Sequence, residues 1–177
     1  MSAQPVVSLT GVLAVRRGER HSLAARAIVA RALGMHRAGD LVLPRFSMTE
    51  QPSAGIVCPA TMPVFVRVAF WLSAAAVPWI LEGIDRGETP ADAALCDLGD
   101  VVQDGFGEQA ESITEIVYPD KRRRWRLLHE AWKEATSFLV REWSQIEALA
   151  MRLYHGAVAA SEIPQLPWKA PKKKGGK

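Results

Sequence analysis

Residues 121–156, KRRRWRLLHEAWKEATSFLVREWSQIEALAMRLYHG, carry the clearest pattern in the chain and decide its fold class. Apolar side chains recur there in steps of three or four residues, which is the spacing of one buried face of an α-helix. They are Trp125, Leu128, Trp132, Ala135, Leu139, Trp143, Ile146, Leu149 and Leu153. We predict a long amphipathic helix that ends at Gly156, with a bend or break at Thr136-Ser137 as the alternative to one continuous helix.

Two more long helices are predicted upstream. Residues 20–33 are rich in alanine and leucine, and Gly34 follows where a helix readily ends. Apolar residues lie on nearly all sides of this segment, so we expect it to be central and buried. Residues 63–82 form the second helix, which Pro78 should kink or restart because proline lacks a backbone donor.

Shorter elements complete the predicted fold. Residues 94–103 suit a short helix, and the glycines within residues 105–107 suit a turn. Residues 41–43 and 55–58 are β-prone runs on either side of a polar stretch, which predicts a small β hairpin. The predicted fold class is therefore mainly α with a small β hairpin.

Length and composition fit one globular domain. The chain has 177 residues, of which 49% are hydrophobic and 23% are charged, so it is not a disordered protein. We divide it into an N-terminal arm (1–18), a helical domain (19–163) and a proline- and lysine-rich tail (164–177) that we expect to be flexible.

Location is predicted from cysteine usage and hydropathy. Cys58 and Cys96 have no CxxC spacing and cannot form a disulfide scaffold, which favours a reducing compartment. Residues 6–15 are broken by polar residues and lack a basic start, so they do not resemble a secretory signal. The apolar run 68–81 is shorter than the roughly 18–20 residues that span a bilayer. We expect a cytoplasmic protein with no membrane span.

Charge is segregated along the chain. Residues 1–46 carry a net charge of +5, residues 47–118 carry −9, and residues 119–177 carry +7. A simple nucleic-acid-binding module does not usually hold such an acidic block at its centre. We expect the basic and acidic segments to neutralise one another within one fold.

The order of these pieces resembles a known family. It includes V-A-R-A-L-G at residues 29–34, W-x-x-I-E-A-L-A at residues 143–150 and Glu162-Ile163. Together they resemble the peptidase domain of the FtsH-type ATP-dependent zinc metalloproteases, especially its small stand-alone relatives. The resemblance spans roughly residues 20–163. It implies a zinc-metalloprotease-like helical domain.

The resemblance also implies that the catalytic apparatus has been lost. In that family the first helix carries HExxH, whose histidines bind zinc and whose glutamate is the general base. Ser22 and Arg26 occupy the two histidine positions, and Leu23 occupies the glutamate position. Asp97 falls on the third ligand position, with Asp100 one turn later. The resemblance therefore implies no catalytic residues and no bound zinc.

A buried carboxylate that has lost its metal is costly unless another group supplies positive charge. We predict that the guanidinium of Arg26 forms an ion pair with Asp97 or Asp100 in place of the metal. The alternative is that Arg26 points to solvent, together with the other arginines of its helix.

Other catalytic or metal sites find less support. A scattered zinc site would require Cys58, Cys96, His21 and Asp97 to converge. The remaining histidines are isolated in the sequence: His36, His129 and His155. The sequence contains no GxSxG, SxxK or GxxxxGK[ST] motif, so we expect neither a serine hydrolase nor an ATP-driven unfoldase.

Basic clusters at residues 121–126 and at the end of the chain suit phosphate backbones, and Trp125 could stack on a base. The alternative places Trp125 in the core, where it begins the apolar stripe. Cations at a helix start oppose the helix dipole, so we expect acidic residues of the 47–118 segment to lie near residues 121–126.

The tail supplies the predicted contact with a partner. Trp168 lies between Pro167 and Lys169, and Lys172, Lys173 and Lys174 follow. A tryptophan among prolines and lysines is typical of a short docking element. The alternative is that Trp168 folds back onto the domain.

We therefore predict a non-catalytic, metallopeptidase-like protein without a cofactor, which acts as a binding or regulatory module for a protein partner. One alternative is a zinc hydrolase of the same family with a displaced or incomplete site. The other is nucleic-acid binding through residues 121–126 and 172–177.

Overall fold

The computed structural model describes residues 9–35, 58, 60–103, 105–156 and 158–169, and this part of the chain is mainly helical. Its helices are α1 (Leu9–Ala32), α2 (Val64–Asp85), α3 (Pro90–Ala93), α4 (Leu98–Val101), α5 (Gly105–Val117), α6 (Lys121–His155) and the 3-10 turn η1 (Ala160–Glu162). The mainly α prediction is confirmed. Apart from Cys58, the predicted β hairpin lies outside the described residues.

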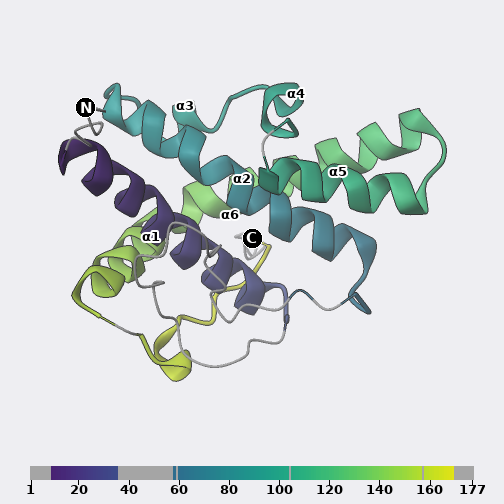
Figure 1. Ribbon diagram of the computed structural model, residues 1–177. Helices are drawn as coiled ribbons and strands as arrows, with labels where there is room; N and C mark the ends of the chain where they lie inside the picture. The colour runs from purple at the N-terminus through teal and green to yellow at the C-terminus, as the bar shows by residue number, and fades with distance from the viewer. Residues whose placement is uncertain (1–8, 36–57, 59, 104, 157, 170–177) are drawn as a thin grey trace, which may run out of the picture.

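Helix α2 is the centre of the fold. It packs against α1, α3, α5 and α6, and it crosses the middle of the molecule in Figure 1. Most of its side chains between Val68 and Leu81 are buried. Ser73 is also fully buried, and its hydroxyl donates to the carbonyl of Phe70 at 2.7 Å, which satisfies the polar group inside the helix. The predicted core role of this apolar run is confirmed.

Pro78 does not restart the second helix, because α2 runs from Val64 to Asp85. The proline ring is exposed, so it occupies the solvent side of the helix and leaves the packed side intact. Among the described helices, α2 has the length and apolar composition to cross a membrane, and 61% of its most apolar window is buried inside the fold. Core helices of folded domains meet the same criterion.

Helix α6 follows the predicted pattern. It is one continuous helix from Lys121 to His155, so Thr136-Ser137 does not divide it. The hydroxyl of Thr136 donates to the carbonyl of Trp132 at 2.9 Å, which accommodates the polar side chain within the helix. Asp120 caps the helix by accepting from the amide of Arg123 at 2.9 Å.

Helix α1 ends where the sequence predicts and begins earlier. Gly34 adopts φ +71°, and the amide of Met35 donates to the carbonyl of Ala30 at 2.8 Å, which is the bond that closes a Schellman motif. The helix begins at Leu9, inside the segment predicted as an arm. Among residues 17–32, whose burial the structure describes, the buried positions are 21–25 and 27–30, in agreement with the predicted central place of residues 20–33.

The connection between α2 and α6 contains two short helices and α5, where the sequence predicted one short helix and a turn. Thr89 caps α3 and Asp97 caps α4, each through a side-chain oxygen that accepts a backbone amide. Gly107 lies inside α5 rather than in a turn, and its backbone packs directly on Val101 and Val102.

Two ion pairs join the oppositely charged segments of the sequence. Arg17 of α1 pairs with Asp85 of α2 at 2.5 Å, and Arg124 of α6 pairs with Glu115 of α5 at 2.7 Å. The second pair shows that one acidic residue of the 47–118 segment, Glu115, lies beside the basic start of α6. Both pairs are partly exposed, so each adds about 1 kcal/mol or less to stability.

Candidate functional site

The three positions that the resemblance assigns to HExxH lie on α1 within the fold. Leu23 is a fully buried core residue, and Ser22 is buried with no hydrogen-bond partner for its Oγ among the described residues. The Nε of Arg26 donates to the carbonyl of Ser22 at 3.4 Å. Ser22 and Leu23 therefore pack in the core with Arg26 at its edge, and serine, leucine and arginine are not usual zinc ligands.

Arg26 has an aromatic partner. Its guanidinium lies 5.1 Å from the centre of the Phe106 ring at the start of α5, in cation–π geometry. Burial lowers the pKa of the guanidinium. The ring face of Phe106 gives the partly buried cation an attractive surface without an acidic group.

The predicted ion pair is not present in the described part of the chain. No salt bridge joins Arg26 to Asp97 or Asp100. Asp97 is exposed, and its Oδ1 accepts from the amide of Gly99 at 2.7 Å. The ion pair was expected because a buried carboxylate would need a compensating positive charge. Asp97 is exposed and caps a helix, so its charge needs no arginine.

The scattered zinc site is not assembled either. Within the described ranges, no three His, Cys, Asp or Glu side chains are grouped so that they could hold a metal ion. Burial raises the pKa of the Cys58 thiol and of the Cys96 thiol, so both favour the protonated form, which is a poor nucleophile and a poor ligand.

His21 is a buried histidine at the contact of α1 with α6. Its Nδ1–H donates to the carbonyl of Arg17 at 2.8 Å, and its ring stacks on Trp143 at 6.0 Å between centres. Burial is the main cause of a lowered pKa for this imidazole. Arg17 and Arg20 lower it further, whereas the hydrogen bond to the carbonyl and the charge of Glu147 on α6 act in the opposite direction.

This environment predicts a pH-dependent stability. The unfolded chain binds a proton at His21 near its ordinary pKa of about 6.5, and the folded chain resists protonation until lower pH. The free energy of unfolding should therefore be highest above pH 6.5 and fall as the pH drops, by at most about 1.4 kcal/mol per pH unit for one proton. Urea unfolding between about pH 5.5 and pH 7.5 measures this slope.

The variant His21→Gln should lose this part of the slope, because glutamine does not titrate. His129→Gln, which changes an exposed histidine of α6, is the matched control and should keep the slope of the unmodified chain. Equal slopes for the two variants would show that His21 does not contribute.

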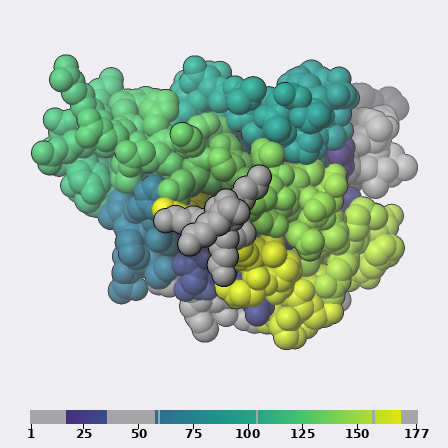
Figure 2. Space-filling model, turned by 180° about the vertical axis from the view of Figure 1, so that it is seen from behind, coloured from purple at the N-terminus to yellow at the C-terminus, as the bar shows by residue number. Residues whose placement is uncertain are grey.

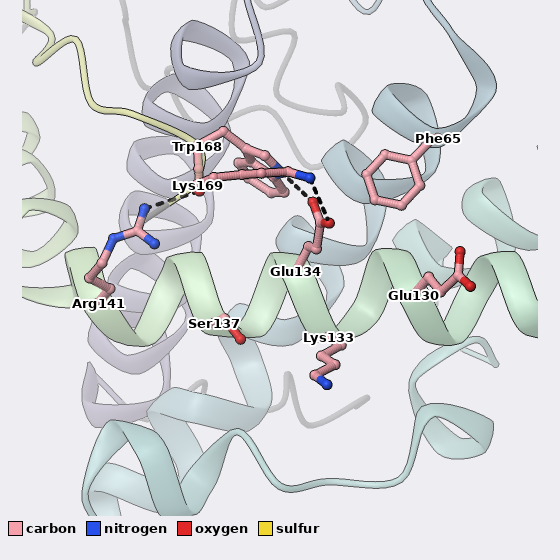
Figure 3. A pocket seen from close by; sticks show the side chains of 8 residues that line it. All are labelled: Phe65, Glu130, Lys133, Glu134, Ser137, Arg141, Trp168 and Lys169. Atoms are coloured by element: carbon pink, nitrogen blue, oxygen red, sulfur yellow. Dashed lines mark hydrogen bonds and ion pairs between the residues drawn. The ribbon is translucent and has the colours of Figure 1, made fainter. Parts of the chain in front are cut away.

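A groove of about 430 Å³ runs along the outside of α6 beside the end of the described chain. It is lined by Phe65, Glu130, Lys133, Glu134, Ser137, Arg141, Trp168 and Lys169. Figure 3 shows the aromatic rings of Phe65 and Trp168 on the same side of α6 as Glu130 and Glu134, whereas Lys133 and Ser137 point the other way. We call the space between the two rings the α6 groove.

One wall of the α6 groove is the C-terminal strap, which we define as residues 158–169. Trp168 stacks on Phe138 at 4.8 Å between ring centres, and its indole N–H donates to Glu134 at 2.8 Å. Arg141 holds the backbone of the strap by donating to the carbonyls of Pro167 at 2.7 Å and Trp168 at 3.1 Å. Trp168 therefore folds back onto the domain, which is the alternative that the sequence left open.

The strap is also fixed to the end of α1. Arg31 donates to Gln165 Oε1 at 2.9 Å and to the carbonyl of Ala160 at 2.9 Å, and Gln165 returns a bond to the carbonyl of Arg31 at 3.1 Å. The buried side chain of Ile163 anchors the middle of the strap in the core. The predicted tail is thus an ordered part of the fold as far as Lys169, and Lys172, Lys173 and Lys174 lie outside the described residues.

The two acidic residues of the α6 groove differ in their partners. Glu134 accepts the Trp168 indole N–H and pairs with Lys169 at 3.4 Å. Glu130 has no hydrogen bond or ion pair in the part of the chain that the structure describes. The lining also holds three cations: Arg141 pairs with Glu142, Lys169 pairs with Glu134, and Figure 3 shows Lys133 pointing away from the rings. The unpaired charge on the side of the rings is therefore the carboxylate of Glu130, which together with an aromatic ring suits a cation.

Comparison with known proteins gives no match: no family model, no curated protein and no solved structure is significantly similar to this chain. The resemblance to FtsH-type peptidase domains accordingly stays a prediction from the sequence.

Proposed function

We propose that the protein is a non-catalytic binding module that holds a basic side chain of a protein partner in the α6 groove. The observation that carries the proposal is the unpaired carboxylate of Glu130 in the lining of the α6 groove, which Figure 3 shows on the Phe65 side of the groove, away from Trp168. A lysine or arginine side chain that entered the groove at the Phe65 ring would gain cation–π attraction from the ring and an ion pair with Glu130.

The residues that line the α6 groove support binding of a ligand rather than catalysis. Its serine, Ser137, points away from the rings, and no histidine lines the space. Trp168 is held by a ring contact, an indole hydrogen bond and two backbone hydrogen bonds, so its ring is in place before a ligand arrives. Such preorganisation lowers the entropic cost of binding.

The test uses Nα-acetyl-arginine amide as the probe and the NMR signal of the Trp168 indole N–H as the reporter. We expect this signal to shift on titration, with Nα-acetyl-citrulline amide, which is uncharged, causing little change. Glu130→Gln should weaken the interaction about fivefold to tenfold, because it removes the charge and keeps the shape. Glu147→Gln, which removes the same charge from an exposed residue of α6 that does not line the groove, is the matched control.

The proposal is contradicted if the arginine probe does not shift the indole signal, or if the probe shifts it equally in the unmodified chain and in the Glu130→Gln chain.

The hydrolase alternative is tested separately by measuring zinc in protein purified without chelator, and casein cleavage with and without chelator. Tightly bound zinc together with chelator-sensitive cleavage would replace the binding module with an enzyme.

A further inference from the structure

The end of the α5–α6 hairpin combines two features that are unusual together on a surface. We define this hairpin end as residues 115–126, which join the last turn of α5 to the first turns of α6. Ile116 is 84% exposed and Val117 is 41% exposed. The hairpin end projects to the right in Figure 1 and forms the green lobe at the upper left in Figure 2.

The second feature is unpaired positive charge. Lys121, Arg122, Arg123 and Arg126 are all exposed, and none forms an ion pair within the described ranges. Arg124 differs from them, because it pairs with Glu115. The other acid of the hairpin end, Asp120, accepts a backbone amide as the cap of α6. The hairpin end therefore has a net charge of +3 beside exposed isoleucine and valine.

We infer that the hairpin end binds an anionic lipid surface, by inserting Ile116 and Val117 among the acyl chains while its cations contact the lipid headgroups. The hairpin end shares no residue with the α6 groove, so the inference does not depend on the proposed function. Basic residues near a membrane attract anionic lipids, and exposed apolar side chains add to the binding when they leave water.

The same cations could attract a nucleic acid, but two observations favour lipid. A phosphate backbone offers no apolar surface to Ile116 and Val117, whereas a bilayer does. Trp125, the aromatic side chain among the basic residues 121–126, is partly buried against the core, and its ring centre lies 5.7 Å from that of His129. It is therefore not displayed as a stacking surface.

The test measures co-sedimentation of the full chain with vesicles of phosphatidylcholine plus phosphatidylserine, and with vesicles of phosphatidylcholine alone. We expect binding to the anionic vesicles that weakens as salt is added. The triple variant Arg122→Gln, Arg123→Gln, Arg126→Gln should bind roughly 100-fold more weakly, since each cation contributes about fivefold. Ile116→Ser should weaken binding about tenfold.

The matched control is the triple variant Lys172→Gln, Lys173→Gln, Lys174→Gln, which removes the same charge from the end of the chain and should retain most of the binding. If this control loses binding and the hairpin triple variant does not, the inference is wrong. It also fails if Ile116→Ser binds as well as the unmodified chain, or if random duplex DNA binds more tightly than the anionic vesicles. All substituted residues of the hairpin end are exposed, and circular dichroism checks that each variant is folded.

Discussion

Replacing Gly107 with alanine is expected to lower the free energy of unfolding by about 3 kcal/mol or more, because the new methyl group has no space. A Cβ atom at this position would lie 2.0 Å from the carbonyl oxygen of Val101 and 2.6 Å from the Cα of Val102. Both are backbone atoms that cannot rotate away, so α5 would have to move off the turn that ends α4. This cost exceeds the gain of about 1 kcal/mol that alanine normally brings to a helix.

Urea unfolding followed by circular dichroism measures the effect, which should appear as a lower midpoint with an unchanged slope. Gly105→Ala is the matched control, since a Cβ atom there meets nothing within 4 Å. It should change stability by no more than about 0.5 kcal/mol. Equal midpoints for the two variants would mean that α5 does not pack closely on Val101 and Val102.

Truncating Phe138 to alanine is expected to cost about 3–5 kcal/mol and to release the C-terminal strap as well. Phe138 is fully buried, and its ring contacts the Trp168 ring on one side of α6. The guanidinium of Arg141 lies 5.2 Å from the same ring and holds the strap backbone. Removal of the ring therefore leaves a cavity and also deprives Trp168 of its stacking surface.

Two measurements separate these effects. Urea unfolding gives the loss of stability, and hydrogen exchange at residues 163–169 reports on the strap under conditions where the rest of the chain is folded. Tyr154→Ala, which removes an aromatic ring that is 58% exposed on the same helix, is the control and should cost less than about 1 kcal/mol. Unchanged exchange at residues 163–169 in the Phe138→Ala chain would show that Trp168 is held by its hydrogen bonds alone.

The long helices could be predicted from the sequence because each of them is encoded locally. The three- and four-residue spacing from Trp125 to Leu153 reports directly which side of α6 is buried, and Gly156 and Gly34 mark helix ends through backbone conformation. The early start of α1 at Leu9 was missed, since the polar residues 16–20 interrupt its apolar pattern without interrupting the helix.

Asp97 illustrates why the expected ion pair with Arg26 is not found. The resemblance implies a metal-ligand position at Asp97, and the ion pair is expected only if that carboxylate is buried. The sequence Cys-Asp-Leu-Gly also predicts a helix cap, because aspartate directly before a short helix accepts a free backbone amide. Recognising the cap would have predicted an exposed Asp97 and would have removed the need for a compensating arginine.

The α6 groove and the strap could not be predicted, because they depend on contacts between distant parts of the chain. Glu130 and Glu134 are one turn apart on the solvent face of α6, and that pattern alone is common on soluble helices. Phe65 comes from the start of α2, and Gln165 meets Arg31 across more than a hundred residues. The spacing of residues along the sequence does not indicate contacts between residues so far apart.

The central place of α2 has a consequence for synthesis of the protein in cells. A chain made at roughly 5–20 residues per second completes α2 about 4–14 s before it completes α6, whose last residue lies 70 positions after Asp85. During that interval α3, α4 and α5 are completed, so α1 and these helices can shield α2, but the side of α2 that packs on α6 stays uncovered. Chaperones or targeting factors at the ribosome exit would meet this helix before α6 covers it, so we expect the speed of translation beyond residue 85 to affect how much of the product escapes aggregation.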